Sequence, residues 1–244
     1  MEFDEWEPVY EAILADFGFD RAADERARDR LCERCRSPTD ATPGDGDATA
    51  TFDPDSLTLA GKSVAVVGAA PSLDTVSEAE RAAAADAVLA ASTAVDVLAG
   101  RGVDVDLMVT DLDKNPETAV AVTRSGTPVA VHAHGDNLPA VERWVPEMDR
   151  EWLVPTTQAA PVGVVRNFGG FTDGDRAAFL ADHFGAAELT FVGWDFDDPT
   201  VDPMKRRKLR WAERLLCWLE RRRGERFALL DGRREDVDTT ALPG

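Results

Sequence analysis

The sequence predicts an α/β fold with a doubly wound, mainly parallel sheet flanked by helices, and a small N-terminal helical cap before it. Beyond residue 57, short apolar stretches alternate with Ala-rich stretches of helical spacing, which is the pattern of a βαβ series. The apolar stretches are continuous, and strands of this kind are buried on both faces by helices. The 244 residues suffice for one sizeable domain and a small appendage.

Residues 1–36 predict the helical cap. Apolar side chains from Trp6 onward recur at helical spacing, Gly18 ends the first helix, and Asp20 can cap a second helix. Residues 37–56 are rich in Pro, Gly, Asp and Thr, with almost nothing to bury, so we interpret them as a linker or loop.

Residues 57–244 form the predicted α/β catalytic domain. We expect its ligands at the carboxyl ends of the strands, where polar residues follow the apolar stretches. Strands are predicted at residues 63–67, 87–91, 107–110, 128–132, 153–155, 163–167 and 189–193, with 227–230 as a candidate edge strand. Helices are predicted near residues 78–85, 95–101, 116–125, 173–184 and 205–223.

Composition disfavours several kinds of partner and location. The chain has 27 basic and 46 acidic side chains, and its net charge of −19 opposes nonspecific binding to nucleic acid or anionic lipid. No window approaches the roughly 18 consecutive apolar residues of a membrane span, and the N-terminus lacks the pattern of a secretory signal. We therefore expect a soluble, cytoplasmic protein. Abundant acid with only four lysines also suggests a halophile, whose fold loosens at low ionic strength.

Cysteine chemistry is not expected. Cys32 and Cys35 form a lone CxxC within a charged helical stretch, and no second ligand pair stands at zinc spacing. We interpret them as reduced helix residues rather than as a redox motif.

The turn after the first strand is a candidate phosphate loop. Gly68, Pro71 and Ser72 lie between a buried strand and a helix, so backbone N–H groups and the Ser72 hydroxyl can meet an anion there. The turn matches neither the P-loop nor the dinucleotide-binding pattern, and an ordinary βα turn remains the alternative.

A pair of aspartates follows the strand at 107–110. Asp111 and Asp113 flank one leucine, and alternation along a strand sends both carboxylates the same way. Two such carboxylates repel each other unless a cation sits between them, and Mg²⁺ with nucleotide phosphates needs only one or two protein carboxylates. The alternative is a solvated pair of turn aspartates.

The loop after the next strand carries His134, Asp136 and Asn137, which we expect to face the same crevice. Histidine is the side chain that can gain or lose a proton most readily near neutral pH, so His134 is a candidate contact for substrate or phosphate, with a capping role as the alternative. Three histidines in the whole chain do not support a His-based zinc site.

Two further clusters lie at strand ends. Asp173 and Asp175 can ligate metal directly or through water, and the Arg176 guanidinium can form bidentate hydrogen bonds to a phosphate. A capped helix start is the alternative explanation of the same residues. Asp195 follows the strand at 189–193 and places another carboxylate at the crevice. Beyond it, Lys205 and Lys208 lie three apart on one helical face and can neutralise polyphosphate, unless that face is merely solvated.

Taken together, these residues resemble the archaeal-type 6-hydroxymethyl-7,8-dihydropterin diphosphokinases, the MptE-like family, which is distantly similar to thiamin diphosphokinases. The resemblance runs through nearly the whole chain. It rests on Trp6, Tyr10 and Asp16-Phe17-Gly18-Phe19, on Gly68 and Pro71-Ser72-Leu73, on residues 109–113 and 131–137, on Thr157-Gln158, on residues 169–176, on Asp195-Phe196, and on Lys205 with Lys208-Leu209.

The resemblance implies a Mg²⁺-dependent transfer of diphosphate from ATP to the hydroxymethyl group of a reduced pterin, with release of AMP, in folate or methanopterin synthesis. ATP and the pterin are the implied partners, and a homodimer is left open. Implied catalytic residues are Asp111, Asp113, His134 and Asp136, and implied metal ligands are Asp111, Asp113, Asp173 and Asp175. Implied nucleotide contacts are Gly68, Pro71, Ser72, Asn137, Arg176, Lys205 and Lys208, and implied substrate contacts are Asp195, Gln158 and Thr172.

One departure from the family pattern affects the phosphate turn. Ala70 stands where we expect a glycine, and its methyl group limits left-handed backbone, which puts close phosphate approach in doubt. The alternatives to this function are a thiamin diphosphokinase-like enzyme, a sugar-nucleotide transferase that uses Asp111 and Asp113 as a DxD metal site, and a non-catalytic nucleotide-binding module.

Overall fold

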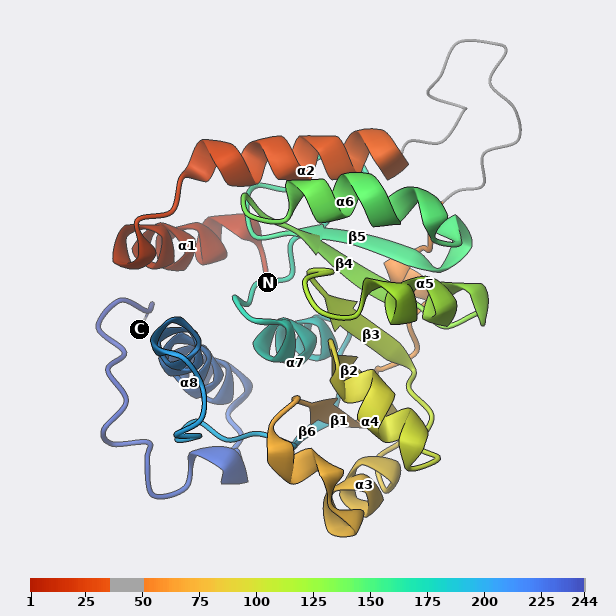
Figure 1. Cartoon of the computed structure of the whole chain (residues 1–244). Coiled ribbons are helices and arrows are strands. Elements are labelled where there is room, and N and C mark those ends of the chain that lie inside the picture. The colour runs from red at the N-terminus through yellow and green to blue at the C-terminus, as the bar shows by residue number, and fades with distance from the viewer. Residues whose placement is uncertain (36–50, 244) are drawn as a thin grey trace, which may run out of the picture.

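The computed structural model describes residues 1–35 and 51–243 and confirms the predicted α/β fold. Six strands form one sheet in the order β5-β4-β3-β2-β1-β6, and every neighbouring pair is parallel (Figure 1). The strands are β1 (Ser63–Val67), β2 (Ala87–Ala91), β3 (Leu107–Thr110), β4 (Val129–Ala133), β5 (Leu153–Thr157) and β6 (Glu188–Val192).

Helices cover both faces of the sheet, as the continuous apolar strands predict. Along β1, Val64 and Val66 enter one core while Ala65 and Val67 enter the other. The first core contains α1 (Phe3–Phe17), α7 (Asp173–His183) and α8 (Pro203–Arg223). The second contains α2 (Arg21–Cys35), α3 (Val76–Ala83), α4 (Ala94–Gly100), α5 (Pro116–Arg124) and α6 (Leu138–Trp144).

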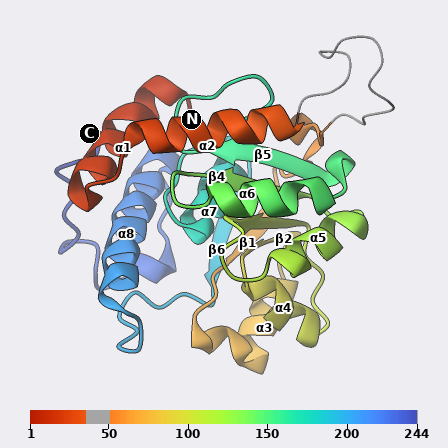
Figure 2. The same ribbon diagram turned by 45° about the horizontal axis from the view of Figure 1, so that its top comes forward.

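The two N-terminal helices therefore pack on opposite faces of the sheet. In both views α2 runs beside β5 and α6 (Figures 1 and 2). Gly18, with φ +71°, ends α1 by donating its N–H to the Leu14 carbonyl. The following turn carries the chain across to the start of α2 at the carboxyl ends of the central strands. Most of the predicted linker, residues 37–50, lies outside the described residues.

Two predicted strands are wrong. Residues 163–167 make only isolated bridges, because Gly163 with φ +56° turns the chain sharply between Val162 and Val165. Residues 227–230 form a 3-10 turn, η6 (Ala228–Leu230), in which Phe227 and Leu230 are both buried. Their spacing of three fits a helical turn that packs on the core, whereas a half-buried strand would bury every second residue.

The cysteine interpretation agrees with the structure. Cys32, Cys35 and Cys217 are buried free thiols, and burial raises the pKa of Cys35 to about 12. Within residues 1–35 and 51–243, no helix has both the length and the apolar composition needed to cross a bilayer.

Candidate active site

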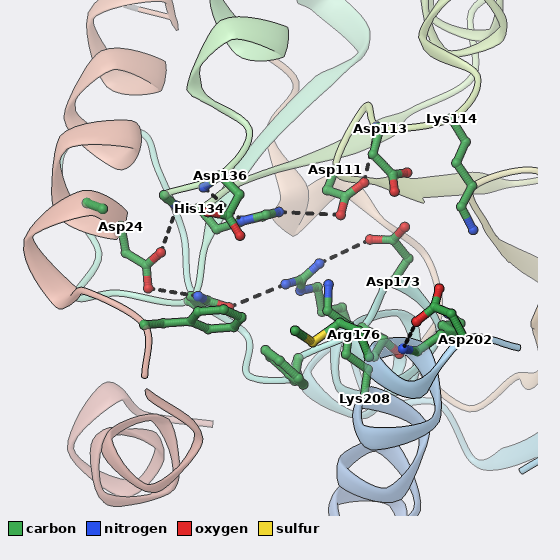
Figure 3. A pocket seen from close by; sticks show the side chains of 18 of the residues that line it. Asp24, Asp111, Asp113, Lys114, His134, Asp136, Asp173, Arg176, Asp202 and Lys208 are labelled. Carbon is green, nitrogen blue, oxygen red and sulfur yellow. Dashed lines mark hydrogen bonds and ion pairs between the residues drawn. The ribbon is translucent and has the colours of Figure 1, made fainter. Parts of the chain in front are cut away.

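A cleft of about 530 Å³ lies at the carboxyl ends of β3 and β4, bounded by the first turns of α7 and α8 and by the turn between α1 and α2 (Figure 3). A smaller cavity of about 130 Å³ adjoins it at the ends of β1 and β6, where the strand order reverses. The sequence-predicted residues that line the larger cleft are Asp111, Asp113, His134, Asp136, Gln158, Thr172, Asp173, Arg176, Lys205 and Lys208. Gly68 and Asp195 line the smaller cavity.

Asp111 and Asp113 reach the cleft through a left-handed turn rather than by strand alternation. β3 ends at Thr110, and the next residue but one, Leu112, has φ +65°. The Leu112 N–H donates to the Thr110 hydroxyl at 3.0 Å, and the Leu112 side chain is buried. The Asp113 N–H donates to Asp111 Oδ1 at 3.2 Å. The buried leucine thus holds a strained turn that presents both carboxylates to the same space.

Asp111 is held from the β4 side. His134 Nε2 lies 3.4 Å from Asp111 Oδ2, and Asn137 Nδ2 donates to the Asp111 carbonyl at 2.8 Å. Asn137 also donates to the His132 carbonyl and accepts from the His134 N–H, so its buried amide is fully engaged. The structure therefore places Asn137 as a brace for the Asp111 turn, and it does not line the cleft as a nucleotide contact.

Three carboxylates crowd one side of the cleft. Burial, together with the hydrogen bond and negative charge of Asp111, raises the pKa of Asp113 to about 6. Burial and the charge of Asp111 raise the pKa of Asp173 to about 7, although Arg176 opposes this rise. Burial also acts against ionisation of Asp111, but hydrogen bonds from His134 and Asp113 outweigh it and lower the pKa of Asp111.

This carboxylate set fits a hard divalent cation that keeps much of its water shell. Among the described residues, no group of three or more His, Cys, Asp or Glu side chains converges as a protein cage for a metal. Mg²⁺ needs only one or two protein carboxylates when phosphates supply further oxygens. Asp111 and Asp113 meet that requirement. A cation bound between them would offset the electrostatic repulsion between the two carboxylates.

Asp175 faces the protein interior. It is fully buried and accepts hydrogen bonds from the backbone N–H groups of Phe171 and Thr172 and from the Thr172 hydroxyl at 2.6 Å. Gly170, with φ +91°, packs against this first turn of α7, where an added Cβ would lie 2.6 Å from the Arg176 Cα. The geometry matches a capped helix start and gives no support to metal ligation by Asp175.

Cations line the same cleft as the carboxylates. Lys114, Lys205 and Lys208 line it, which accounts for three of the four lysines in the chain. Burial and the charge of Lys114 lower the pKa of Lys205. Arg176 lies beside Asp173, with Nη1 3.1 Å from Asp173 Oδ1 (Figure 3). Sequence reasoning missed Lys114, although its place directly after the aspartate pair in a lysine-poor chain was a usable signal.

The turn after β1 offers fewer phosphate donors than its sequence suggests. The N–H groups of Gly68 and Ala70 donate to the carbonyls of Val192 and Gly193 at 2.9 Å. A Cβ at Gly68 would lie 2.7 Å from the Gly193 carbonyl oxygen, so close approach of two backbone turns explains this glycine. Pro71 and Ser72 are exposed on a 3-10 turn, η3 (Pro71–Asp74), and line neither cavity.

Asp24 in α2 is a cleft residue that sequence reasoning missed. Asp24 is only 3% exposed. Acidic and basic side chains are interspersed along α2, so the sequence of the helix does not indicate that this aspartate is buried. Its Oδ2 accepts from the Tyr10 hydroxyl at 2.8 Å and from Gln158 Nε2 at 2.7 Å, and its Oδ1 accepts from the Gly135 N–H at 2.7 Å. The N-terminal helices thereby contribute directly to the wall of the cleft (Figure 3).

The sequence is similar to known proteins over most of its length. Residues 49–200 match the family described as 6-hydroxymethylpterin diphosphokinase MptE-like. A protein of Methanothermobacter thermautotrophicus named 6-hydroxymethyl-7,8-dihydropterin pyrophosphokinase is 38% identical over 238 residues, which cover 91% of this chain and 96% of that protein. Proteins of the same name from Pyrococcus furiosus and Methanocaldococcus jannaschii are 34% and 30% identical, covering 90% of this chain and 95% and 96% of their own lengths.

Proposed function

The chain belongs to the MptE-like family of 6-hydroxymethylpterin diphosphokinases, and we propose that it transfers a diphosphate group from ATP to the hydroxymethyl group of 6-hydroxymethyl-7,8-dihydropterin. One observation from the site carries this proposal. Asp111, Asp113 and Asp173 share a single cleft with Lys114, Lys205 and Lys208, which suits a polyphosphate bound together with a divalent cation.

The reaction exchanges one P–O bond for another and moves the hydroxyl proton to a base. The pterin hydroxyl oxygen attacks the β-phosphorus of ATP, and the bond from that phosphorus to the oxygen bridging the α- and β-phosphates breaks, so AMP leaves with the bridging oxygen. Chemistry of this kind needs positioning and charge neutralisation more than covalent help from the protein. Lys205, Lys208 and Arg176 would neutralise and orient the phosphates from their side of the cleft.

Asp111 and Asp113 would hold Mg²⁺, which when bound neutralises charge on the phosphates. Asp136 is exposed beside His134, and within the described part of the chain its carboxylate makes no hydrogen bond or ion pair, so it is free to accept the proton of the attacking hydroxyl. Asp195 at the smaller cavity would accept hydrogen bonds from the aminopyrimidine edge of the pterin.

The test is product formation by the purified protein in molar KCl with Mg²⁺, ATP and 6-hydroxymethyl-7,8-dihydropterin. We expect AMP and pterin diphosphate in equal amounts, and Asp111→Asn should abolish both while leaving the unfolding transition in place. Asp104→Asn, at an exposed aspartate away from the cleft, is the matched control. Product from thiamin but not from the pterin would favour the thiamin enzyme, and ATP binding without transfer to either would leave a binding module.

A further inference from the structure

We infer that Asp24 is a positioning residue, which fixes the orientation of the Arg176 guanidinium through the side chain of Gln158. Asp24 accepts from Gln158 Nε2 at 2.7 Å, and Gln158 Oε1 lies 3.4 Å from Arg176 Nη2. All three residues are at most 6% exposed. The inference rests on the proposed function for its catalytic consequence, but the contacts themselves are independent of it.

The chemistry of the two ends determines which way the Gln158 amide points. Asp24 accepts hydrogen bonds at both of its carboxylate oxygens, and the guanidinium of Arg176 only donates them. A glutamine between them satisfies both partners in a single orientation, with its NH₂ toward Asp24 and its oxygen toward Arg176. The buried carboxylate therefore sets the amide, and the amide presents an acceptor to the arginine.

The same carboxylate also braces the opposite wall of the cleft. Its second oxygen accepts from the Gly135 N–H, next to His134, which in turn contacts Asp111. The Gly135 backbone sits directly on α2, since a Cβ there would lie 2.6 Å from the Ala23 Cβ. Asp24 thus connects two neighbours of the cleft carboxylates, Arg176 beside Asp173 on one side and His134 beside Asp111 on the other (Figure 3).

The hydrogen-bond relay consists of Asp24, Gln158 and Arg176. The variant Asp24→Asn tests this relay because it replaces a carboxylate, which accepts at both oxygens, with an amide that also donates. If the asparagine oxygen keeps the Gly135 N–H, its NH₂ faces the NH₂ of Gln158. Gln158 must then turn over and present its own NH₂ to Arg176, which puts donor against donor. We expect kcat to fall about 10- to 100-fold, the usual result of moving a catalytic group by a fraction of an ångström to 1 Å.

A second substitution should rescue the first. Gln158→Glu in the Asp24→Asn background offers one carboxylate oxygen to the asparagine NH₂ and the other to Arg176, so we expect most of kcat to return. Tyr10→Phe is the matched control, because it removes another hydrogen bond to the same oxygen of Asp24 but leaves the acceptor that faces Gln158 unchanged. It should lower the melting temperature by a few degrees and keep kcat near the wild-type value.

Each outcome decides the question. Asp24→Asn with unchanged kcat and KM, in a preparation whose wild type turns over, overturns the inference and leaves the proposed function standing. Loss of kcat without rescue by Gln158→Glu, or equal loss in Tyr10→Phe, shows a merely structural role. If the wild type makes no product, the proposed function fails. Calorimetric ATP binding then tests the relay alone, and Asp24→Asn must weaken it about tenfold while Tyr10→Phe does not.

Discussion

Replacing Asp173 by Asn should stabilise the metal-free protein at neutral and higher pH while it impairs the enzyme. The pKa of this carboxyl stands at about 7 rather than 3.8, because burial and the charge of Asp111 oppose its ionisation. Each pH unit corresponds to about 1.4 kcal/mol. The ionised Asp173 therefore costs the folded state at most about 4 kcal/mol, a figure that already contains the opposing attraction of Arg176.

The sign of the pH dependence follows from where the proton binds more tightly. The folded chain holds the Asp173 proton up to about pH 7, whereas the unfolded chain releases it near 3.8. Wild-type stability therefore falls as the pH rises between these values, and the asparagine variant, which carries no such proton, does not follow it. The advantage of the variant should be absent at pH 4, grow through pH 7 and remain constant above.

The assay is urea unfolding in EDTA and molar KCl at pH 4.5 and pH 8, with a thermal scan beside it. At pH 8 the variant should melt up to roughly 10 °C higher than the wild type, and Asp104→Asn should not. Adding Mg²⁺ and ATP should stabilise the wild type by mass action but raise the variant less. An Asp173→Asn protein that is less stable than the wild type at pH 8 in EDTA would refute the reasoning.

Three further outcomes follow from charge and burial. Because the net charge is −19, the unfolding midpoint should rise from dilute buffer to molar KCl, and an unchanged midpoint would contradict adaptation to salt. Lys205→Gln should weaken ATP binding about tenfold, the equivalent of one charge-assisted hydrogen bond, whereas Lys62→Gln, remote from the cleft, should not; equal affinities would remove Lys205 from the phosphate site. Burial and the charge of Arg176 hold the pKa of His132 well below 6.5. As the pH falls, the unfolded chain therefore binds the His132 proton before the folded chain does. The stability of the wild type should then fall below pH 6.5 by up to about 1.4 kcal/mol per pH unit. Unfolding free energies of His132→Asn between pH 6.5 and 5 should give a flatter slope, and parallel slopes would show that this histidine does not contribute.

Elements with strong local patterns were predictable from the sequence. β1, β2 and β3 lie where their continuous apolar runs predict them, because burial on both faces leaves a signal in every residue. Residues 227–230 carry a similar apolar run, yet their burial comes from packing on α8 and the core rather than from strand pairing. Composition over four residues does not distinguish the two cases.

The candidate site was predictable as a location but not as a set of contacts. Polar residues at strand ends indicated the cleft, because parallel strands bring their carboxyl ends to one edge. Asp173 and Asp175 look equivalent in sequence, but residues two apart on a helix point about 200° apart, so one reaches the cleft and the other caps the helix from inside. Asp24 meets Gly135 and Gln158 across more than a hundred residues, and no local pattern encodes such a meeting.

The cleft contains charged side chains that a bound cation and polyphosphate would neutralise. Within residues 1–35 and 51–243, none of Lys114, Lys205 and Lys208 forms an ion pair with the aspartates that line the same cleft. Like charges also repel within each set, since burial and the charge of Asp111 raise the pKa of Asp113, and burial and the charge of Lys114 lower that of Lys205. A cation relieves only the aspartates and a polyphosphate relieves only the lysines, so the pair together removes both penalties. A cleft whose charges were already paired would be more stable and would bind such a ligand less tightly, because each contact would first have to be broken.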